Sequence, residues 1–412
     1  MPEDLLLADR DFRLLLLGQT TSQLGTQVSG VAVPLLAVLV LDASPFELGL
    51  VSASATVSFA LVGLPAGAWL DRVRRRPVLV ACDLVRAVLL ASIPVAAAAG
   101  VLGIGQLVVV SLLVGFARVF FDVGYQSYLP GLVGRDRVLA GNSALEAVRA
   151  TGQVAGPGLG GWLVGVLGAA DVVAVQAATF AVSAVSLLAI RAQEAPPPAR
   201  VARTRLRAEV EEGLRFVLGS RVLRALALCS ALGNFSFAVA SAVTVVFMAH
   251  TLGLSPAAIG AVMAAGSVAV MVGAACIPSL GRWFGSARLT WLSVAVSAPL
   301  TLLGPFAWDS GAASIALLVV SAAAGEAGQI VYAVTSVSLR QRLVPEHLLS
   351  RVSATSRFLI MGLFPLGALL GGVLGSLVGA RTTLWVAAGL MCLSCLPVAA
   401  VVGRAREVDE LS

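Results

Sequence analysis

The arginine residues of this chain are confined almost entirely to alternate gaps between long apolar runs. The chain has no lysine, so all 28 of its basic Lys and Arg positions are arginine. The arginines of successive gaps include Arg10 and Arg13, Arg72 and Arg76, Arg135 and Arg137, Arg191 and Arg224, Arg282 and Arg288, Arg340 and Arg342, and Arg404 and Arg406. Positively charged loops stay in the cytoplasm during membrane insertion. The rhythm therefore predicts a multi-pass protein of a bacterial inner (cytoplasmic) membrane, with both termini cytoplasmic and an even number of crossings.

The composition agrees with a chain that faces lipid. Hydrophobic residues make up 58% and charged residues 12%, and the mean hydropathy is +0.95. A soluble core of 412 residues does not need so much apolar surface. A spanning helix needs about 20 apolar residues, and we count twelve such windows, centred near residues 28, 58, 89, 118, 154, 181, 235, 269, 298, 326, 365 and 392. We expect an all-α polytopic membrane protein with twelve transmembrane helices.

The net charge of +6 does not point to nucleic acid, because the arginines lie where anionic cytoplasmic lipid would meet them. The short loops leave no room for a soluble catalytic domain. Cys392 and Cys395 form a CxxC without a second pair or a nearby His, so no metal site is expected. No phosphate-binding motif is present either, and we expect no cofactor, no enzyme activity and a monomer.

The longest polar stretch divides the chain into two equal sets of spans. It runs from Arg191 to Arg221 and opens with prolines 196 to 198. The amphipathic spacing from about Arg203 to Leu218 predicts a helix on the cytoplasmic surface. The expected organisation is an N-terminal six-helix bundle over residues 1–190, a linker over 191–221 and a C-terminal six-helix bundle over 222–412.

The two halves carry a repeated pattern. Arg149 stands eight residues before Pro157, and Arg357 stands eight residues before Pro365, so both pairs are offset by 208 residues. Two parallel halves related by an axis along the membrane normal are an arrangement of transporters, in which a small-molecule substrate binds between the halves. The repeat therefore favours transport.

The segment after the second apolar run reads GAWLDRVRRRPVL, from residue 67 to residue 79. A carboxylate such as Asp71 at a cytoplasmic helix end can pair with an arginine and face the positive N-terminus of a neighbouring helix. It would then act as a conformational latch; the alternative is a solvated charged turn. The segment resembles the signature between helices 2 and 3 of the major facilitator superfamily, with Gly67, Asp71, Arg72 and Arg76 in matching positions and Arg74 where glycine is usual.

The fifth apolar run carries a set of small residues around one proline, namely Gly152, Gly156, Pro157, Gly160 and Gly161. Glycines at four-residue spacing allow close helix approach, and the proline allows a bend. Generic helix packing is the alternative explanation. The pattern looks like the signature of the drug-exporting antiporters of the same superfamily, which implies export.

Further stretches resemble the branch that contains macrolide efflux proteins and the enterobactin exporter. They are DFRLLLLGQTTSQLG near the start, DLVRA in the third run, YLPGLVGRDRVLAGNSALEAVR and EEGLRFVL. The resemblance implies two pseudo-symmetric bundles of six helices, alternating access and proton-driven export of drug-like molecules, secondary metabolites or siderophores. Thr26 stands where that branch often has an acidic residue. The alternative function is an uptake symporter or facilitator for a nutrient or metabolite.

Three ionisable residues lie deep within predicted spans. Such groups are costly in the bilayer and usually functional. Arg118 and Asp122 are four apart and share one helix face, where they either gate protonation or form a neutralised structural pair. Glu326 has no basic residue within one turn, so it is the first candidate to carry the coupled proton, unless it pairs with an arginine such as Arg118.

Other polar residues fall into two groups. Those nearer the cytoplasmic ends are expected to form an inter-helix charge network that closes an inner gate: Asp83, Arg86, Glu146, Arg149 and Arg357. Those expected to line a wide, mostly apolar substrate cavity are Gln19, Gln23, Gln27, Asn234, Gln329 and Tyr332. Such a cavity suits amphipathic molecules that bind loosely.

Overall fold

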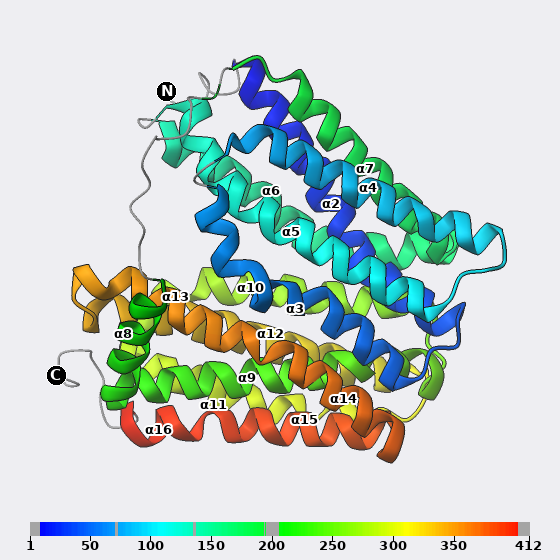
Figure 1. Ribbon diagram of the computed structural model, residues 1–412. Helices are drawn as coiled ribbons and strands as arrows, with labels where there is room; N and C mark the ends of the chain where they lie inside the picture. Colours follow the sequence, from blue (N-terminus) through cyan, green and yellow to red (C-terminus); the bar gives the residue numbers. More distant parts are fainter. Residues whose placement is uncertain (1–8, 71–72, 135–136, 193, 195–205, 403–412) are drawn as a thin grey trace. The chain divides into compact units, whose positions relative to one another are not determined.

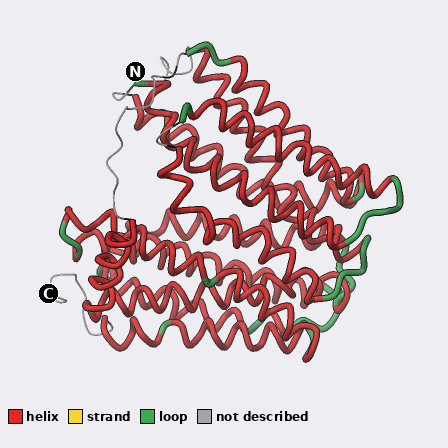
Figure 2. The backbone as a smooth tube through the Cα atoms, in the orientation of Figure 1, coloured by secondary structure: helices red, strands yellow, loops and turns green. Residues whose placement is uncertain are grey.

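The fold is all helical. The structure, a computed structural model, describes residues 9–70, 73–134, 137–192, 194 and 206–402. Across these described ranges every regular element is a helix and none is a strand (Figure 2). The sequence prediction of an all-α polytopic membrane protein is confirmed.

The helices follow one another with short connections (Figure 1). The first half contains α2 (Arg10–Leu39), α3 (Pro45–Leu70), α4 (Arg75–Ala98), α5 (Ile104–Val133), α6 (Val138–Leu167) and α7 (Ala169–Ala189). After α8 (Leu206–Gly219) come α9 (Arg221–Val246), α10 (Pro256–Phe284), α11 (Ser286–Thr301), α12 (Ala312–Leu343), α13 (Glu346–Gly362), α14 (Phe364–Val378), α15 (Ala380–Ser394) and α16 (Leu396–Val402).

Eleven helical segments in the described part of the chain are long and apolar enough to cross a membrane. The fifth predicted window falls on α6, which has 30 residues but is not among the eleven. Its glycines, Gln153, Glu146 and Arg149 lower its mean hydropathy. Since α6 is as long as α5, its length is sufficient for a span.

The residues group into two compact units by their contacts. Unit 1 holds residues 1–43, 54–202 and 255–264, and unit 2 holds residues 44–53, 203–254 and 265–412. The first ten residues of α3 and its preceding turn thus pack within unit 2, and the start of α10 packs within unit 1. In unit 1, α7 packs closely along both α2 and α4.

The structure shows the internal repeat as equivalent helix starts 211 residues apart. The pairs of first residues are Arg10 and Arg221, Pro45 and Pro256, Arg75 and Ser286, and Ala169 and Ala380. The capping residues repeat as well, because the side chains of Asp9 and Ser220 both accept backbone N–H bonds at their helix starts. Asp42 and Gly253, also 211 apart, both have positive φ. The two halves are therefore built on the same pattern of helices.

This repeat corrects the offset of 208 residues derived from the prolines. At an offset of 211, Gly156 is equivalent to Gly367, and the pair Gly160 and Gly161 is equivalent to Gly371 and Gly372. Pro157 and Pro365 are not equivalent positions, because packing is conserved at the glycines that admit a neighbouring helix rather than at the prolines. Gly168 and Gly379 confirm the register, since each ends its helix with a left-handed φ, of 91° and 85°.

Candidate functional site

Two charged side chains of unit 1 lie exposed in the middle of α5. Arg118 Nε and Asp122 Oδ2 are 3.6 Å apart, and the side chains are 63% and 54% exposed. The two residues therefore form a neutralised pair on one helix face, as their spacing indicates. Because a lipid-facing charge pair in mid-span would be costly, this face of α5 belongs against water or polar groups.

A second pair lies in the interior of unit 1, on α4. Asp83 is fully buried and Arg86 is 4% exposed, and an Arg86 terminal nitrogen donates to Asp83 Oδ1. The Arg86 guanidinium carbon lies 4.3 Å from the ring centres of both Phe121 and Phe180. The pair joins residues of one helix, so it does not form the inter-helix network that we expected for these two residues.

The charged pair nearer the start of α6 has the same intra-helical character. Arg149 Nε donates to both carboxylate oxygens of Glu146, at 3.1 and 2.9 Å, and both side chains are exposed. The Arg149 hydrogen bonds lower the pKa of Glu146. Arg357, the last member of the predicted network, has a side chain outside the described part of the structure.

Glu326 lies midway along α12 in unit 2 and is partly buried. Its Cγ lies 3.3 Å from the place where a Cβ on Gly266 of α10 would be. Among the described residues, no hydrogen bond or ion pair reaches its carboxyl group. Glu326 thus occupies space that Gly266 leaves open, with an unpaired carboxyl inside a span.

The predicted glutamine stripe of α2 is divided by its packing. Gln19 is only 4% exposed, and its Nε2 has no hydrogen-bond partner in the described structure. Gln27 packs against Gly156 of α6, and Gln23 and Gln27 are both partly buried. Gln19 therefore does not line an open cavity in this structure, while the other two amides remain candidates.

The polar residues expected to line a cavity in unit 2 also differ in their surroundings. Tyr332 is 2% exposed; its hydroxyl donates to the Leu226 carbonyl at 2.7 Å and lies 3.1 Å from Ser230 Oγ. It is a core residue, which corrects its assignment to the cavity. Asn234 donates to the Ser230 carbonyl within α9, and the Gln329 amide lies beside Gly233.

The glycines of α6 make close contacts with two helices of unit 1. A Cβ on Gly160 would lie 2.5 Å from the Val28 carbonyl oxygen of α2, and Gly156 is packed just as closely on Gln27. On another face, a Cβ on Gly161 would lie 2.7 Å from Gly260 Cα of α10. The backbone of α6 is thus in direct contact with two neighbours.

The equivalent glycines of α14 do the same in unit 2. A Cβ on Gly367 would lie 2.7 Å from the Phe235 carbonyl oxygen of α9. A Cβ on Gly372 would lie 3.2 Å from Gly49 Cα of α3, and one on Gly49 would lie 2.6 Å from the Ala368 carbonyl oxygen. The glycine pattern of the fifth span is therefore repeated structurally in α14.

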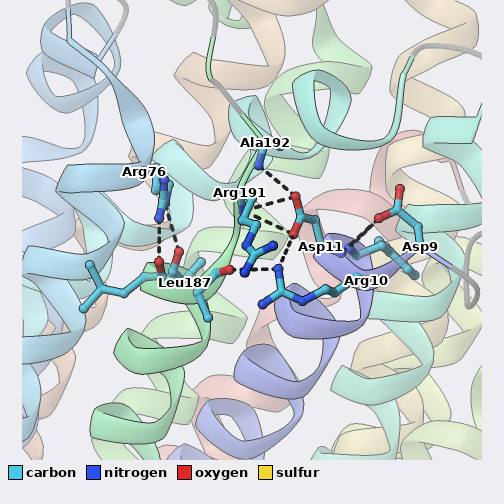
Figure 3. Close-up of polar contacts among 10 residues, drawn as sticks. Asp9, Arg10, Asp11, Arg76, Leu187, Arg191 and Ala192 are labelled. Atoms are coloured by element: carbon cyan, nitrogen blue, oxygen red, sulfur yellow. Dashed lines mark hydrogen bonds and ion pairs between the residues drawn. The ribbon is translucent and has the colours of Figure 1, made fainter.

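The segment between α3 and α4 is only partly described. Gly67 lies within α3, but its surroundings, and the whole of Asp71 and Arg72, lie outside the described residues. Arg76 donates to the carbonyl oxygens of Leu187 and Leu188 at 2.9 and 2.7 Å, where α7 ends (Figure 3). Arg76 therefore satisfies the C-terminal carbonyl groups of a neighbouring helix.

Two carboxylates that the sequence analysis did not single out complete this end of unit 1. Glu194 accepts the backbone N–H groups of Arg75 and Arg76, at 2.8 and 3.1 Å, at the start of α4. Asp11 accepts those of Arg191 and Ala192, at 3.2 and 2.8 Å (Figure 3). Glu194 thus has the position at a helix N-terminus that we predicted for Asp71. Its place beside the arginine-rich gap was the available signal.

The chain was compared with known proteins. Residues 15–363 match the sequence profile of the Major Facilitator Superfamily. The chain is 28% identical over 408 residues to the multidrug efflux pump Tap of Mycolicibacterium fortuitum, covering 96% of each protein. It is 29% identical over 226 residues to Tap of Mycobacterium tuberculosis, covering 52% of each.

Solved structures of transporters have the same fold. A mutant of the nucleoside transporter NupG superimposes with a TM-score of 0.77 at 14% identity, over 95% of this chain and 99% of that one. An inward-facing bacterial homologue of the iron transporter ferroportin gives 0.71 at 18% identity, over 95% and 98%. At these identities the likeness concerns the fold alone.

Proposed function

Because the chain belongs to the Major Facilitator Superfamily, we propose that this transporter exports amphipathic drug-like molecules, secondary metabolites or siderophores in exchange for protons. It would do so by alternating access in the bacterial inner membrane, with both termini in the cytoplasm. The observation that carries export is the full-length similarity to the multidrug efflux pump Tap. The glycine pattern of α6 supports it.

Glu326 is the first candidate for the coupled proton. A carboxyl group without a partner inside a span is costly when ionised and tolerable when it holds a proton. Gly266 leaves room beside it on α10, so its protonation and release need no large repacking. A carrier that must bind a proton in one state and release it in another requires such a group.

Asp122 is the second candidate. The exposed pair with Arg118 keeps the Asp122 carboxylate balanced, and a proton arriving there would free the arginine. A substrate or its counter-charge could then interact with Arg118. Protonation at Asp122 would in this way change the charge that the α5 face presents.

The partly buried amides support an amphipathic substrate. Gln23 and Gln27 on α2, with Asn234 and Gln329 in unit 2, offer hydrogen bonds among largely apolar neighbours. A site of this composition binds through apolar area and a few polar contacts rather than through fixed charge. Such binding is compatible with several related substrates.

Liposomes with the purified protein and an imposed pH gradient test the proposal. With the interior acidic, we expect labelled macrolides or siderophores to accumulate inside and the lumen to become more alkaline. Glu326→Gln should abolish both responses, while Asp171→Asn, which removes an exposed carboxylate at the start of α7, should leave them intact. Substrate and protons moving in the same direction would instead establish uptake by symport.

A further inference from the structure

The buried pair of α4 has an incompletely satisfied carboxylate. Asp83 Oδ1 accepts from Arg86, but Asp83 Oδ2 has no hydrogen-bond partner in the described structure. Ser183 of α7 lies near enough to influence this carboxyl, yet its hydroxyl also lacks a hydrogen bond of normal geometry. A proton on Oδ2 would supply the missing donor, since Ser183 Oγ can accept it.

Arg86 does not depend on Asp83 alone for its stabilisation. The rings of Phe121 and Phe180 cover the guanidinium at 4.3 Å each, and its Nε donates to the Cys82 carbonyl at 3.4 Å. Cation–π contacts are strongest where water is excluded. The arginine therefore keeps favourable contacts when Asp83 is neutralised, so the aspartate is free to change its charge.

The fold itself does not require a charged pair at this place. The equivalent positions in unit 2, 211 residues further on, are Val294 and Ser297, which are 2% and 6% exposed. The second half thus closes the same packing position without a charge. A buried ion pair is rarely more stabilising than apolar packing of similar volume, so stability does not account for Asp83 and Arg86.

The exposed pair of α5 connects this interior to the unit surface. Both Arg118 and Asp122 act electrostatically on Arg86, and Phe121 lies between them in sequence. The other titratable group facing the pair is Cys82 on the same helix. From α7 the facing residues are Phe180 and Ser183, which do not titrate. A change of charge at Asp122 is therefore felt at Arg86 and Asp83.

We propose that Asp83 is a proton-binding site within unit 1, coupled to Asp122 through Arg86, with Ser183 as the hydrogen-bond acceptor of the protonated carboxyl. Protonation forms the Oδ2–H bond and weakens the Asp83–Arg86 ion pair. The Arg86 guanidinium, held between the two rings, then attracts the Asp122 carboxylate more strongly. This site deepens the coupling part of the proposed function, on which it rests.

Infrared difference spectroscopy of the purified full-length protein, acid minus alkaline, tests the site without substrate or transport. We expect a carboxylic acid C=O band that disappears in Asp83→Asn and persists in Glu326→Gln. Asp122→Asn should move the pH at which the band forms. Loss of a band in none of these variants except Glu326→Gln would overturn the site.

A second variant covers the case in which Asp83→Asn does not fold. Ser183→Ala leaves the ion pair in place and should shift the frequency of the same band, because the protonated carboxyl loses its acceptor. An unshifted band would overturn the site. If the Asp83 band is present but liposomes show no proton-driven export, the proposed function is wrong. If export is proton-driven but the band is missing, the coupling carboxyl lies elsewhere.

Discussion

Gly161 of α6 and Gly260 of α10 are in backbone contact within unit 1. A Cβ on Gly161 would lie 2.7 Å from Gly260 Cα and 2.5 Å from the Pro256 carbonyl oxygen. The obstructing atoms belong to the backbone, so no side-chain rotation can relieve them. The close approach of these two helices therefore requires glycine at this position.

Gly161→Ala should destabilise the protein by about 1–3 kcal/mol, the usual cost of overpacking. Substrate export should fall with it, because α6 and α10 must separate to admit the methyl group. Gly165→Ala is the matched control, since it lies one turn further along the same helix with nothing within 4 Å of its Cβ. Thermal unfolding in detergent measures both, and equal midpoints would contradict the role of the contact.

Glu326→Gln should separate substrate movement from the proton gradient. The neutral amide resembles the protonated carboxyl in size, so the packing against Gly266 is retained. We expect substrate exchange between equal concentrations on both sides to continue, while accumulation driven by a pH gradient is lost. A variant that still accumulates substrate would show that another group carries the proton.

Exchanging the charges of the α5 pair should affect transport more than stability. An exposed pair contributes about 0–1 kcal/mol, and Arg118 and Asp122 are both more than half exposed. Arg118→Asp combined with Asp122→Arg should therefore unfold at nearly the wild-type temperature and lose export. A large fall in the unfolding temperature would indicate that the pair is structural.

The sequence was sufficient for the fold because its signals are additive along the chain. Apolar length and arginine placement predict each span independently, and eleven described segments qualify by the same physical property. The glycine spacing of α6 was informative for a similar reason, since residues four apart share one helix face. Gly156 and Gly160 accordingly contact the same helix, α2.

The orientation of single polar side chains was not predictable. In a span, apolar residues face both lipid and protein, so hydropathy does not show which side of a helix is inside. Tyr332 was therefore assigned to a cavity although its hydroxyl bonds to Leu226 in the core of unit 2. The register of the repeat failed similarly. Arg149 with Pro157 was matched to Arg357 with Pro365, whereas helix starts and glycine contacts repeat at 211 residues.

The carboxylate of Asp11 should hold the chain where it leaves α7. It accepts the backbone N–H groups of Arg191 and Ala192, which begin the polar stretch between the halves. Asp11→Ala should therefore speed amide hydrogen exchange at these two residues. Asp9→Ala removes only the cap of α2 and is the control that should leave them protected. Unchanged exchange in Asp11→Ala would show that other contacts fix this segment.

Asp309, in the connection before α12, gives a pH dependence outside the spans. Hydrogen bonds from Ser314 Oγ, at 2.7 Å, and from the Gly311 N–H, at 3.0 Å, lower the pKa of Asp309. A carboxyl with a lowered folded-state pKa adds stability above its unfolded pKa, which is about 3.9 for Asp. That contribution is lost as the pH falls through the lowered folded-state value.

The unfolding temperature of the wild type relative to Asp309→Asn should therefore be constant near neutral pH and decline in acid. The same comparison in a Ser314→Ala background should give a smaller difference near neutral pH, because the first-ranked cause of the shift is gone. Thermal unfolding of the four proteins from about pH 7 to about pH 3 brackets the ordinary Asp value. A difference that grows in acid would have the wrong sign, and one equal in both backgrounds would show that Ser314 does not set the pKa of Asp309.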